Sequence, residues 1–457
     1  MYFLYLYDYL MLPFYLAIGV VLLNTYFKRK HGNDHKLKKH FNRGLFFKLI
    51  GCVFIAMIYE YYYQGAYDGR FYFEGAKMLT NYWQQNPSEF FHVLFNNMYD
   101  FNNTNLSSLN TYDVNIFANE SFFVCKIAAI FNIFSFNAFL PCSLIFCFFA
   151  FIALWNLFIF LVREFNLTYR LAGFCTIYIP SVLIWDSSIF KDTITFSALC
   201  WLFVCGYYVF VRPKNILWNV FGMLLSGFFI YQIKVYILGA FAPFFILYIF
   251  NSHKGRIKND LVKMMSTPFV LAVSGGLIYL MLANADVLLG RYSVDKVLET
   301  ASKTYYNINN AGQAGSAYEM NVDLSSFTGL ITGLPKGINV TLFRPYPWEY
   351  LKPIILFASV ESMIILYFTL YIIFKIGLGK TIQTIWRTPI LQFCLLFSLI
   401  FAFMIGVSSS NFGSLVRYKI PCLPFYILFL VLLYWKHYAV FNPRLAAKNQ
   451  QQMIQTA

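Results

Sequence analysis

Apolar residues run in stretches of roughly 20 along the whole chain, and short polar or charged segments separate them. A stretch of this length can cross the hydrocarbon core of a membrane as a helix. The pattern therefore predicts an all-α polytopic membrane protein with about eleven transmembrane helices. The predicted spans are residues about 9–27, 45–63, 138–162, 171–187, 193–211, 216–232, 236–251, 267–284, 353–374, 389–407 and 420–435.

Two long polar segments interrupt the spans, at about 64–122 and 286–350, and we expect both as large outer (periplasmic) loops. The apolar segment near 122–136 is ambiguous. As a span it would reverse the orientation of everything that follows, so we expect a loop or an interfacial helix there. The predicted parts of the chain are the N-terminal spans with a basic loop (1–63), the first outer loop (64–137), a central bundle (138–284), the second outer loop (285–352) and the C-terminal spans with a tail (353–457).

Charge sets the expected orientation. The 457 residues carry a net charge of +15, yet only 12% of them are charged, whereas soluble domains have about a quarter. When the spans alternate sides, about 22 of the 35 basic residues, Lys48 among them, fall on one side. Such an excess marks the cytoplasmic side, so we expect the N-terminus outside, the C-terminus in the cytoplasm, and no nucleic-acid partner. The nine cysteines form no CxxC pair and are typical of buried apolar residues.

Asp68 is the leading candidate for chemistry, because it follows a span directly and lies among tyrosines and small residues. We expect the aromatic neighbours to desolvate its carboxylate and make it more basic, as a general base requires. Glu74 would assist it or hold a divalent metal. The alternative is a solvated loop acid, or an acid paired with Arg70.

Cations gather on the same expected side. The outer turn before residue 193 carries Lys191, a candidate phosphate ligand, and Asp192, which would orient it; the alternative is that Lys191 only pairs with a neighbouring acid. Arg344, set among prolines and aromatics, and Arg417 suit a phosphate or carboxylate. The alternative for each is an interfacial anchor. Lys419 and Lys234 are further candidate phosphate ligands, and the alternative for Lys234 is an interfacial lysine that snorkels toward the head groups.

The segment 67–76, with Asp68 and the Gly75-Ala76 pair, resembles the acid-bearing loop of polytopic glycosyltransferases of the GT-C fold, which use polyprenyl-phosphate-linked sugars. The later basic residues resemble cations that contact lipid phosphate in those enzymes and in bacterial polysaccharide polymerases. Departures are the missing second adjacent acid and an extra span before the loop. Taken with the charged residues, the resemblance implies the following roles: Asp68 and Glu74 catalytic; Arg70, Lys191, Asp192, Lys234, Arg344, Arg417 and Lys419 on the lipid phosphate; Tyr67, Tyr72, Trp185, Trp348 and Glu349 on the acceptor or sugar.

The sequence thus predicts a bacterial inner-membrane enzyme that moves a sugar or oligosaccharide from a polyprenyl (di)phosphate to a glycan, lipid or protein acceptor. No cofactor is expected beyond a possible divalent metal. The alternatives are a polysaccharide polymerase or ligase, in which the late loop carries the chemistry, and a transporter or flippase of lipid-linked glycans. Several N-x-[ST] matches in the outer loops leave an endoplasmic-reticulum origin open.

Overall fold

The computed structural model describes residues 3–63, 68–96, 119–254, 327–349, 353–409 and 411–441 of the chain. Their regular elements are helices, with no β-strand among them, which confirms the all-α prediction. The helices of the first half are α1 (Leu6–His31), α2 (His35–Met57) with a π-helical extension η1 (Ile58–Tyr62), α3 (Asp68–Gln85), η2 (Pro87–Glu89), α4 (Phe90–Phe95), α5 (Asn119–Ser135), α6 (Phe139–Phe165), α7 (Tyr169–Cys175), α8 (Pro180–Trp185), α9 (Lys191–Gly206) with η5 (Tyr207–Val211), and α10 (Ile216–His253). Those of the second half are α14 (Phe327–Phe343), α15 (Pro353–Ile376), α16 (Leu378–Arg387), α17 (Pro389–Ser408), α18 (Phe412–Tyr418) and α19 (Leu423–Phe441).

Seven of the described helices are long and apolar enough to cross a membrane, and the bent pair Phe412–Tyr418 and Leu423–His437 makes an eighth if it counts as one span. This is the composition of a multi-pass membrane protein. The described residues do not reach the predicted eleven spans. The predicted span 267–284 lies outside them, and 171–187 is not one helix, because α7 ends at Cys175 and α8 begins anew at Pro180. Proline has no N–H to continue a helix but suits its first turn.

Helix α10 folds back on itself at Lys234. It has 38 residues, so a straight helix would be about 57 Å long. Yet it begins five residues after Val211, where η5 ends, and at its far end His253 Nε2 lies 2.6 Å from the carbonyl oxygen of Phe210. Both ends therefore lie beside the end of η5, and the non-helical backbone of Lys234 (φ −147°, ψ 69°) makes the turn. The two arms correspond to the predicted spans 216–232 and 236–251.

The ambiguous segment forms α5, a 17-residue helix that packs on α3. Thr80 of α3 donates to the carbonyl oxygen of Ala129 at 3.3 Å, and Asn132 donates to the Thr80 hydroxyl at 3.2 Å. The amphipathic α3 thus has a partner for its apolar face. A helix here fits both a span and an interfacial helix, and the choice of the interfacial helix stays a prediction.

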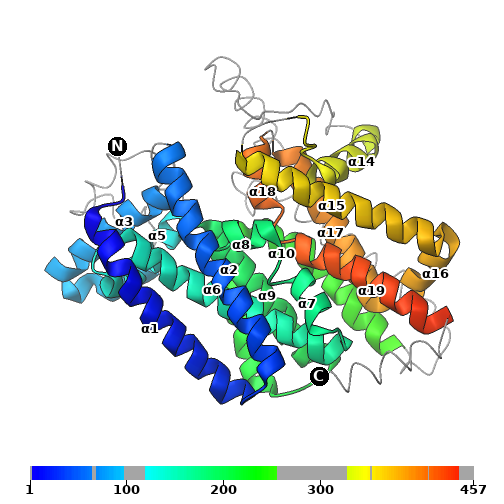
Figure 1. The fold of residues 1–457 in the computed structure, drawn as a ribbon, viewed down its shortest axis with the longest axis horizontal. Helices are drawn as coiled ribbons and strands as arrows, with labels where there is room; N and C mark the ends of the chain where they lie inside the picture. Colours follow the sequence, from blue (N-terminus) through cyan, green and yellow to red (C-terminus); the bar gives the residue numbers. More distant parts are fainter. Residues whose placement is uncertain are drawn as a thin grey trace.

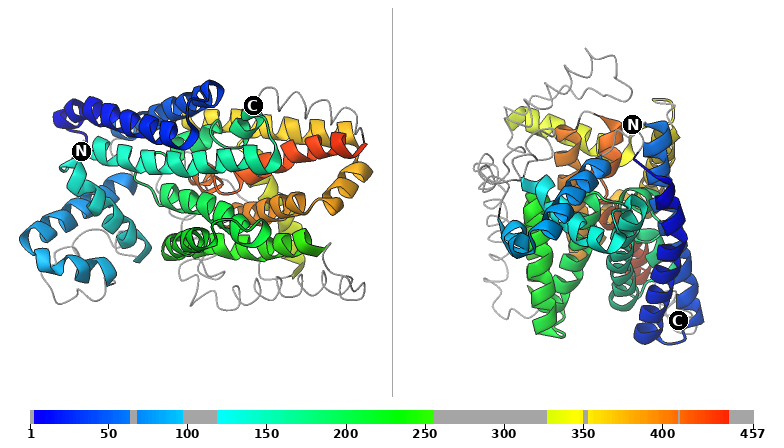
Figure 2. Two further views of the ribbon diagram at one scale, coloured as in Figure 1. Left: turned by 90° about the horizontal axis from the view of Figure 1, so that it is seen from below. Right: turned by 90° about the vertical axis from the view of Figure 1, so that its left-hand side faces the viewer.

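The bundle has two distinguishable ends. One, here called the basic end, holds the C-terminal ends of α1, α6, η5 and α10. After α6 and α1, the Tyr169 hydroxyl lies 3.2 Å from Asp34, and Arg212 after η5 lies 2.8 Å from Glu164 of α6. The other, here called the site end, holds the end of η1, the starts of α6 and α9, and the turn at Lys234. In Figure 1, α9 and α10 lie between the early helices α1–α6 and the late helices α15–α19, whereas the left view of Figure 2 shows α10 at an outer face of the bundle. The core between them is rich in phenylalanine: Phe203, Phe241, Phe393, Phe397 and Phe425 stack or meet edge to face.

Candidate functional site

Four charged side chains from four helices meet at the site end. Arg417 Nη2 lies 2.7 Å from Asp68 Oδ2, and Arg417 Nε lies 3.1 Å from Asp192 Oδ2. The second oxygen of Asp192 accepts from Lys234 Nζ at 2.5 Å. Asp68, Asp192, Lys234 and Arg417 are called the charge cluster below. All four were predicted from the sequence, in segments up to about 350 residues apart, and the structure brings them together.

The backbone explains why each member lies there. Asp68 and Asp192 are in the first turns of α3 and α9, where the helix dipole favours a negative charge. Lys234 is at the turn of α10, so its side chain reaches the start of α9. Arg417 is in α18, a short helix whose start is capped by Asn411, which accepts from the Gly413 amide at 2.7 Å. The charges thus lie at the starts of two helices, at the turn of α10 and in one short capped helix.

Aromatic rings enclose the two cations. The Arg417 guanidinium carbon lies 5.2 Å from the ring centroid of Phe190 and 5.2 Å from that of Tyr418. The Lys234 ammonium lies 4.6 Å from the centroid of the same Tyr418 ring. Cation–π contacts of this kind hold a cation in place without neutralising it. Trp185, a predicted sugar contact, is buried behind Phe190, with ring centroids 6.1 Å apart.

Exposure differs sharply within the charge cluster. The Asp68 side chain is 48% exposed, that of Arg417 14%, that of Lys234 4% and that of Asp192 2%. Asp192 is therefore the buried counter-ion that fixes both cations. Asp68 is the acid that a molecule from outside can reach, and Arg417 connects the two.

The electrostatics of Asp68 correct one expectation. The surrounding protein raises the pKa of this carboxyl by desolvation, but the charge and hydrogen bond of Arg417, together with the charges of Lys191 and Lys234, hold the pKa below its usual value. The sequence had suggested a more basic carboxylate. The Asp68 carboxyl is instead ionised, because the Arg417 guanidinium beside it stabilises the anion.

From the sequence, an Asp68–Arg70 pair was the alternative to a general base; in the structure the ion pair of Asp68 is with Arg417. Neither Asp186 nor Asp192 forms an ion pair with Lys191: Asp192 is held by Lys234 and Arg417, and Asp186 by Lys48. Lys191 instead contributes its positive charge to the field at Asp68. With Lys191 counted, the described residues around Asp68 comprise three cations, Lys191, Lys234 and Arg417, and two acids, Asp68 and Asp192.

Lys48 is not on the basic side where the charge count placed it. It lies within α2 with no exposed side-chain area, 2.7 Å from Asp186 Oδ2 and 3.0 Å from the carbonyl oxygen of Val182. This pair fixes the segment between α8 and α9 to α2, and that segment leads into Lys191 and Asp192. A lysine inside a predicted span was the sequence signal for such a buried pair.

Arg344 and Glu349 form a pair of their own. Glu349 accepts from the Arg344 guanidinium, with Nε to Oε1 at 2.8 Å, and from the Tyr346 amide at 2.7 Å. The guanidinium also lies 5.1 Å from the ring centroid of Phe412, which follows Asn411 at the start of α18. Trp348 is exposed and stacks on Tyr346. The predicted phosphate ligand Arg344 thus has a carboxylate partner within its own loop.

Lys419 is buried away from solvent and donates to the hydroxyl of Ser362 in α15 at 2.8 Å. Beside it, Glu361 accepts from the amide and hydroxyl of Ser181, both at 2.7 Å, and so caps the start of α8. Glu361 of α15 thus bonds a neighbouring helix. For Lys419 the contact indicates a link between α15 and the end of α18.

Glu74 pairs with Lys77 at 2.9 Å on α3. Six residues on a helix correspond to about 240°, so Glu74 and Asp68 are on different faces, whereas Tyr72, four residues on, shares the face of Asp68 and is buried. Tyr67 lies outside the described residues. Within the described ranges, no group of three or more His, Cys, Asp or Glu side chains is placed to hold a metal ion.

Sequence reasoning missed Phe190, Tyr418 and Tyr236 as walls of the site, and Lys48 as its support. Phe190 and Tyr418 directly precede or follow a predicted residue, so proximity in the sequence was the available signal. Tyr236, two residues after Lys234, is buried near the charge of Asp192. Comparison of the chain with known protein families, with characterised proteins and with solved structures finds no match.

Proposed function

We propose that this protein is a membrane glycosyltransferase that moves a sugar or oligosaccharide from a polyprenyl (di)phosphate to an acceptor hydroxyl at the site end of the bundle. The observation that carries the proposal is Arg417, which bridges a half-exposed acid and a buried acid beside Lys234. In such an arrangement Arg417 and Lys234 can bind an oxyanion, and the neighbouring Asp68 carboxylate can accept a proton from an incoming hydroxyl. The long apolar helices place the protein in a membrane, and a polyprenyl chain can lie in the same membrane.

The phosphate has a defined place in this proposal. Its oxygens would compete with Asp68 for the Arg417 guanidinium, while Asp192 keeps Arg417 and Lys234 in position. Neutralising the charge of Arg417 removes the main influence that lowers the pKa of Asp68. Donor binding would therefore convert Asp68 from an ion-pair partner into a base, so that the base becomes active when the donor is present.

In the transfer step the acceptor oxygen forms a bond to the anomeric carbon and the bond from that carbon to the phosphate oxygen breaks. Asp68 takes the acceptor proton. The phosphate leaves with the electron pair, and Arg417 and Lys234 stabilise its charge. A single displacement of this kind inverts the anomeric carbon.

The test is turnover of a radiolabelled polyprenyl-phosphate sugar by purified protein in vesicles. We expect Asp68→Asn to lose most turnover, roughly 10²-fold or more for removal of a general base. Arg417→Gln should weaken both binding and turnover. Arg212→Gln is the matched control, because it removes an ion pair at the basic end. Full activity in a folded Asp68→Asn variant contradicts the proposal.

A transporter of lipid-linked glycans is the second candidate, and the Lys48–Asp186 pair favours it. Ionisable residues buried in spans often mark transport pathways. The same vesicles separate the two functions. Labelled lipid that changes leaflet without being consumed would support transport, whereas consumption of the label with appearance of a glycosylated product supports transfer.

A further inference from the structure

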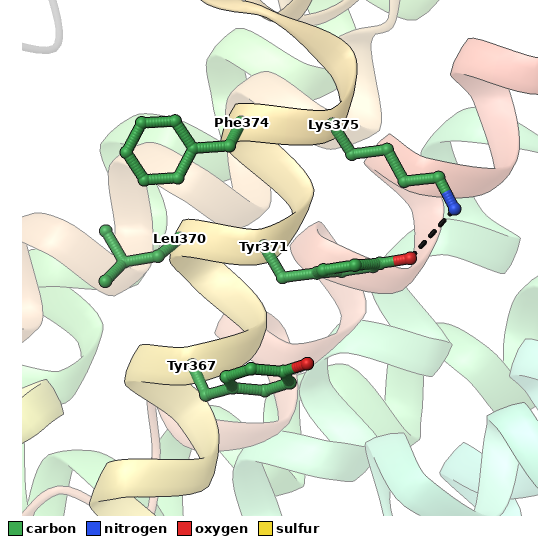
Figure 3. A pocket seen from close by; sticks show the side chains of 5 residues that line it. All are labelled: Tyr367, Leu370, Tyr371, Phe374 and Lys375. Carbon is green, nitrogen blue, oxygen red and sulfur yellow. Dashed lines mark hydrogen bonds between the residues drawn. The ribbon is translucent and has the colours of Figure 1, made fainter.

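A surface groove lies on α15, toward the basic end and away from the charge cluster. Its lining residues are Tyr367, Leu370, Tyr371, Phe374 and Lys375. Their spacing of three and four places them on one face of the helix. Figure 3 shows the aromatic and aliphatic side chains projecting from successive turns, with Lys375 reaching over toward the Tyr371 hydroxyl. Phe374 is 81% exposed and Tyr367 63%, so the groove is open to its surroundings.

The groove ends in a cation, Lys375, whose two hydrogen-bond partners are phenol hydroxyls. Lys375 Nζ donates to the hydroxyls of Tyr371 at 2.8 Å and of Tyr434 in α19 at 3.0 Å. It lies 5.1 Å and 5.2 Å from the centroids of the same two rings. In the part of the chain that the structure describes, no carboxylate forms an ion pair with it. An ammonium has three protons, so one remains for an anion once the two phenols are bound.

The next helix shows where this cation lies relative to a membrane. The chain turns at Gly377 (φ 84°) into α16, which presents Leu378, Ile382 and Trp386 as an exposed apolar stripe. Thr381 and Thr384 on the other side are buried against the protein. A short amphipathic helix with tryptophan and basic residues, here Lys380 and Arg387, is typical of a segment that lies in the plane of the membrane interface. Lys375, three residues before the start of α16 at Leu378, is thereby placed at the level of lipid phosphates.

We propose that this groove binds one anionic phospholipid, with an acyl chain along Tyr367, Leu370 and Phe374 and the headgroup phosphate on Lys375. The order of the features carries the assignment: an apolar track along a spanning helix, then a cation with phenol hydroxyls, then an interfacial helix. This order matches a phospholipid from tail to head. A peptide or a second copy of the chain would not require the cation at the interface. The site is independent of the proposed transferase function, because it lies at the opposite end of the bundle.

The test is native mass spectrometry of the purified full chain released from mixed micelles that contain phosphatidylglycerol or phosphatidylcholine. We expect wild type to retain one phosphatidylglycerol in preference to phosphatidylcholine. Lys375→Met should reduce this retention about fivefold, the usual effect of one interfacial cation on anionic lipid. Lys375→Arg should restore it, and Leu370→Gln should reduce retention through the apolar track.

Lys214→Met is the matched control, since Lys214 is a basic residue at the same end that lies over Tyr208 rather than in the groove. The Lys214→Met variant should retain as much phosphatidylglycerol as wild type. Equal retention of phosphatidylglycerol by wild type and Lys375→Met overturns the proposal, as does equal retention of the two lipids by wild type. A dimer that dissociates with Leu370→Gln, without bound lipid, would assign the groove to a second copy instead.

Discussion

Arg417 is the residue on which the site depends. It is nearly buried, it contacts one acid that is accessible and one that is not, and two aromatic rings cover its guanidinium. A cation held in this way keeps its position when one acid is exchanged for another anion. The half-exposed Asp68 is the partner that can be exchanged, because water or a ligand can replace its contact without leaving a charge buried.

The Asp68–Arg417 pair predicts a pH dependence. The pKa of Asp68 is lowered in the folded protein, so its contribution to stability is present above the unfolded pKa of about 3.9 and is lost as pH falls through the folded value. With 48% of the Asp68 side chain exposed, we expect this contribution to be at most about 1 kcal/mol. The melting temperature of wild type minus that of Asp68→Asn, measured in one detergent, should be constant from pH 8 to 5 and shrink below about pH 4. A difference that changes between pH 6 and 8 contradicts the lowered pKa.

The Lys48–Asp186 pair predicts a different response, because both side chains are buried. Lys48→Met leaves the Asp186 carboxylate without its partner, and we expect a loss of about 3–5 kcal/mol in the free energy of unfolding. The double variant with Asp186→Leu removes both charges and should recover most of that loss. Unfolding in denaturant measures Lys48→Met, Asp186→Leu and the double variant against wild type. If the double variant is as destabilised as the sum of the single ones, the two residues do not act as a pair.

At the scale of elements, breaks in helices build the site. Lys234 occupies the turn of α10, Asp192 follows the break between α8 and α9, and Arg417 lies in the short helix before α19. Each break places a charged side chain where a continuous helix would place another apolar turn. The long helices between them hold these breaks at a common level.

The sequence predicted these elements unevenly. The turn at Lys234 was predicted, because one charged residue separates two apolar runs and apolar periodicity records such interruptions. The single span at 171–187 was wrong, since hydropathy averages over the break that Pro180 marks. The acids and cations of the site were predicted by type, but their partners were not: nothing local in the sequence connects Arg417 to Asp68 or Lys48 to Asp186. Such pairs follow from packing between distant segments.

The fold of α10 can be tested directly by spin labels at positions 218 and 252, near its two ends. A straight helix would separate these positions by about 51 Å. In the folded-back form both arms lie beside α9, and packed axes are 8–10 Å apart, so we expect a label distance below about 35 Å. Pulsed electron paramagnetic resonance on the reconstituted protein measures it. A distance near the straight-helix value would falsify the turn at Lys234.

At the scale of the whole molecule, the two ends differ in chemistry. The site end presents acids and cations within a ring of aromatics, and the basic end presents exposed cations such as Arg212, whose side chain is 70% exposed. Lys375 and α16 add an interfacial surface at the basic end. An excess of basic residues at one end is the pattern of a protein whose orientation is set by charge. We therefore expect the charge cluster to face outward and the groove on α15 to lie in the inner leaflet.

This orientation is tested by placing single cysteines at the two ends, at Phe71 on the exposed face of α3 and at Arg212. All nine native cysteines are buried, so background labelling by a membrane-impermeant maleimide should be low. In intact cells, or in spheroplasts if an outer membrane is present, Phe71→Cys should be labelled from outside, and Arg212→Cys only after the membrane is permeabilised. The reverse pattern would place the charge cluster in the cytoplasm. A donor presented on the outer leaflet could not then reach Arg417, and the transferase would have to act on lipid-linked sugars of the inner leaflet.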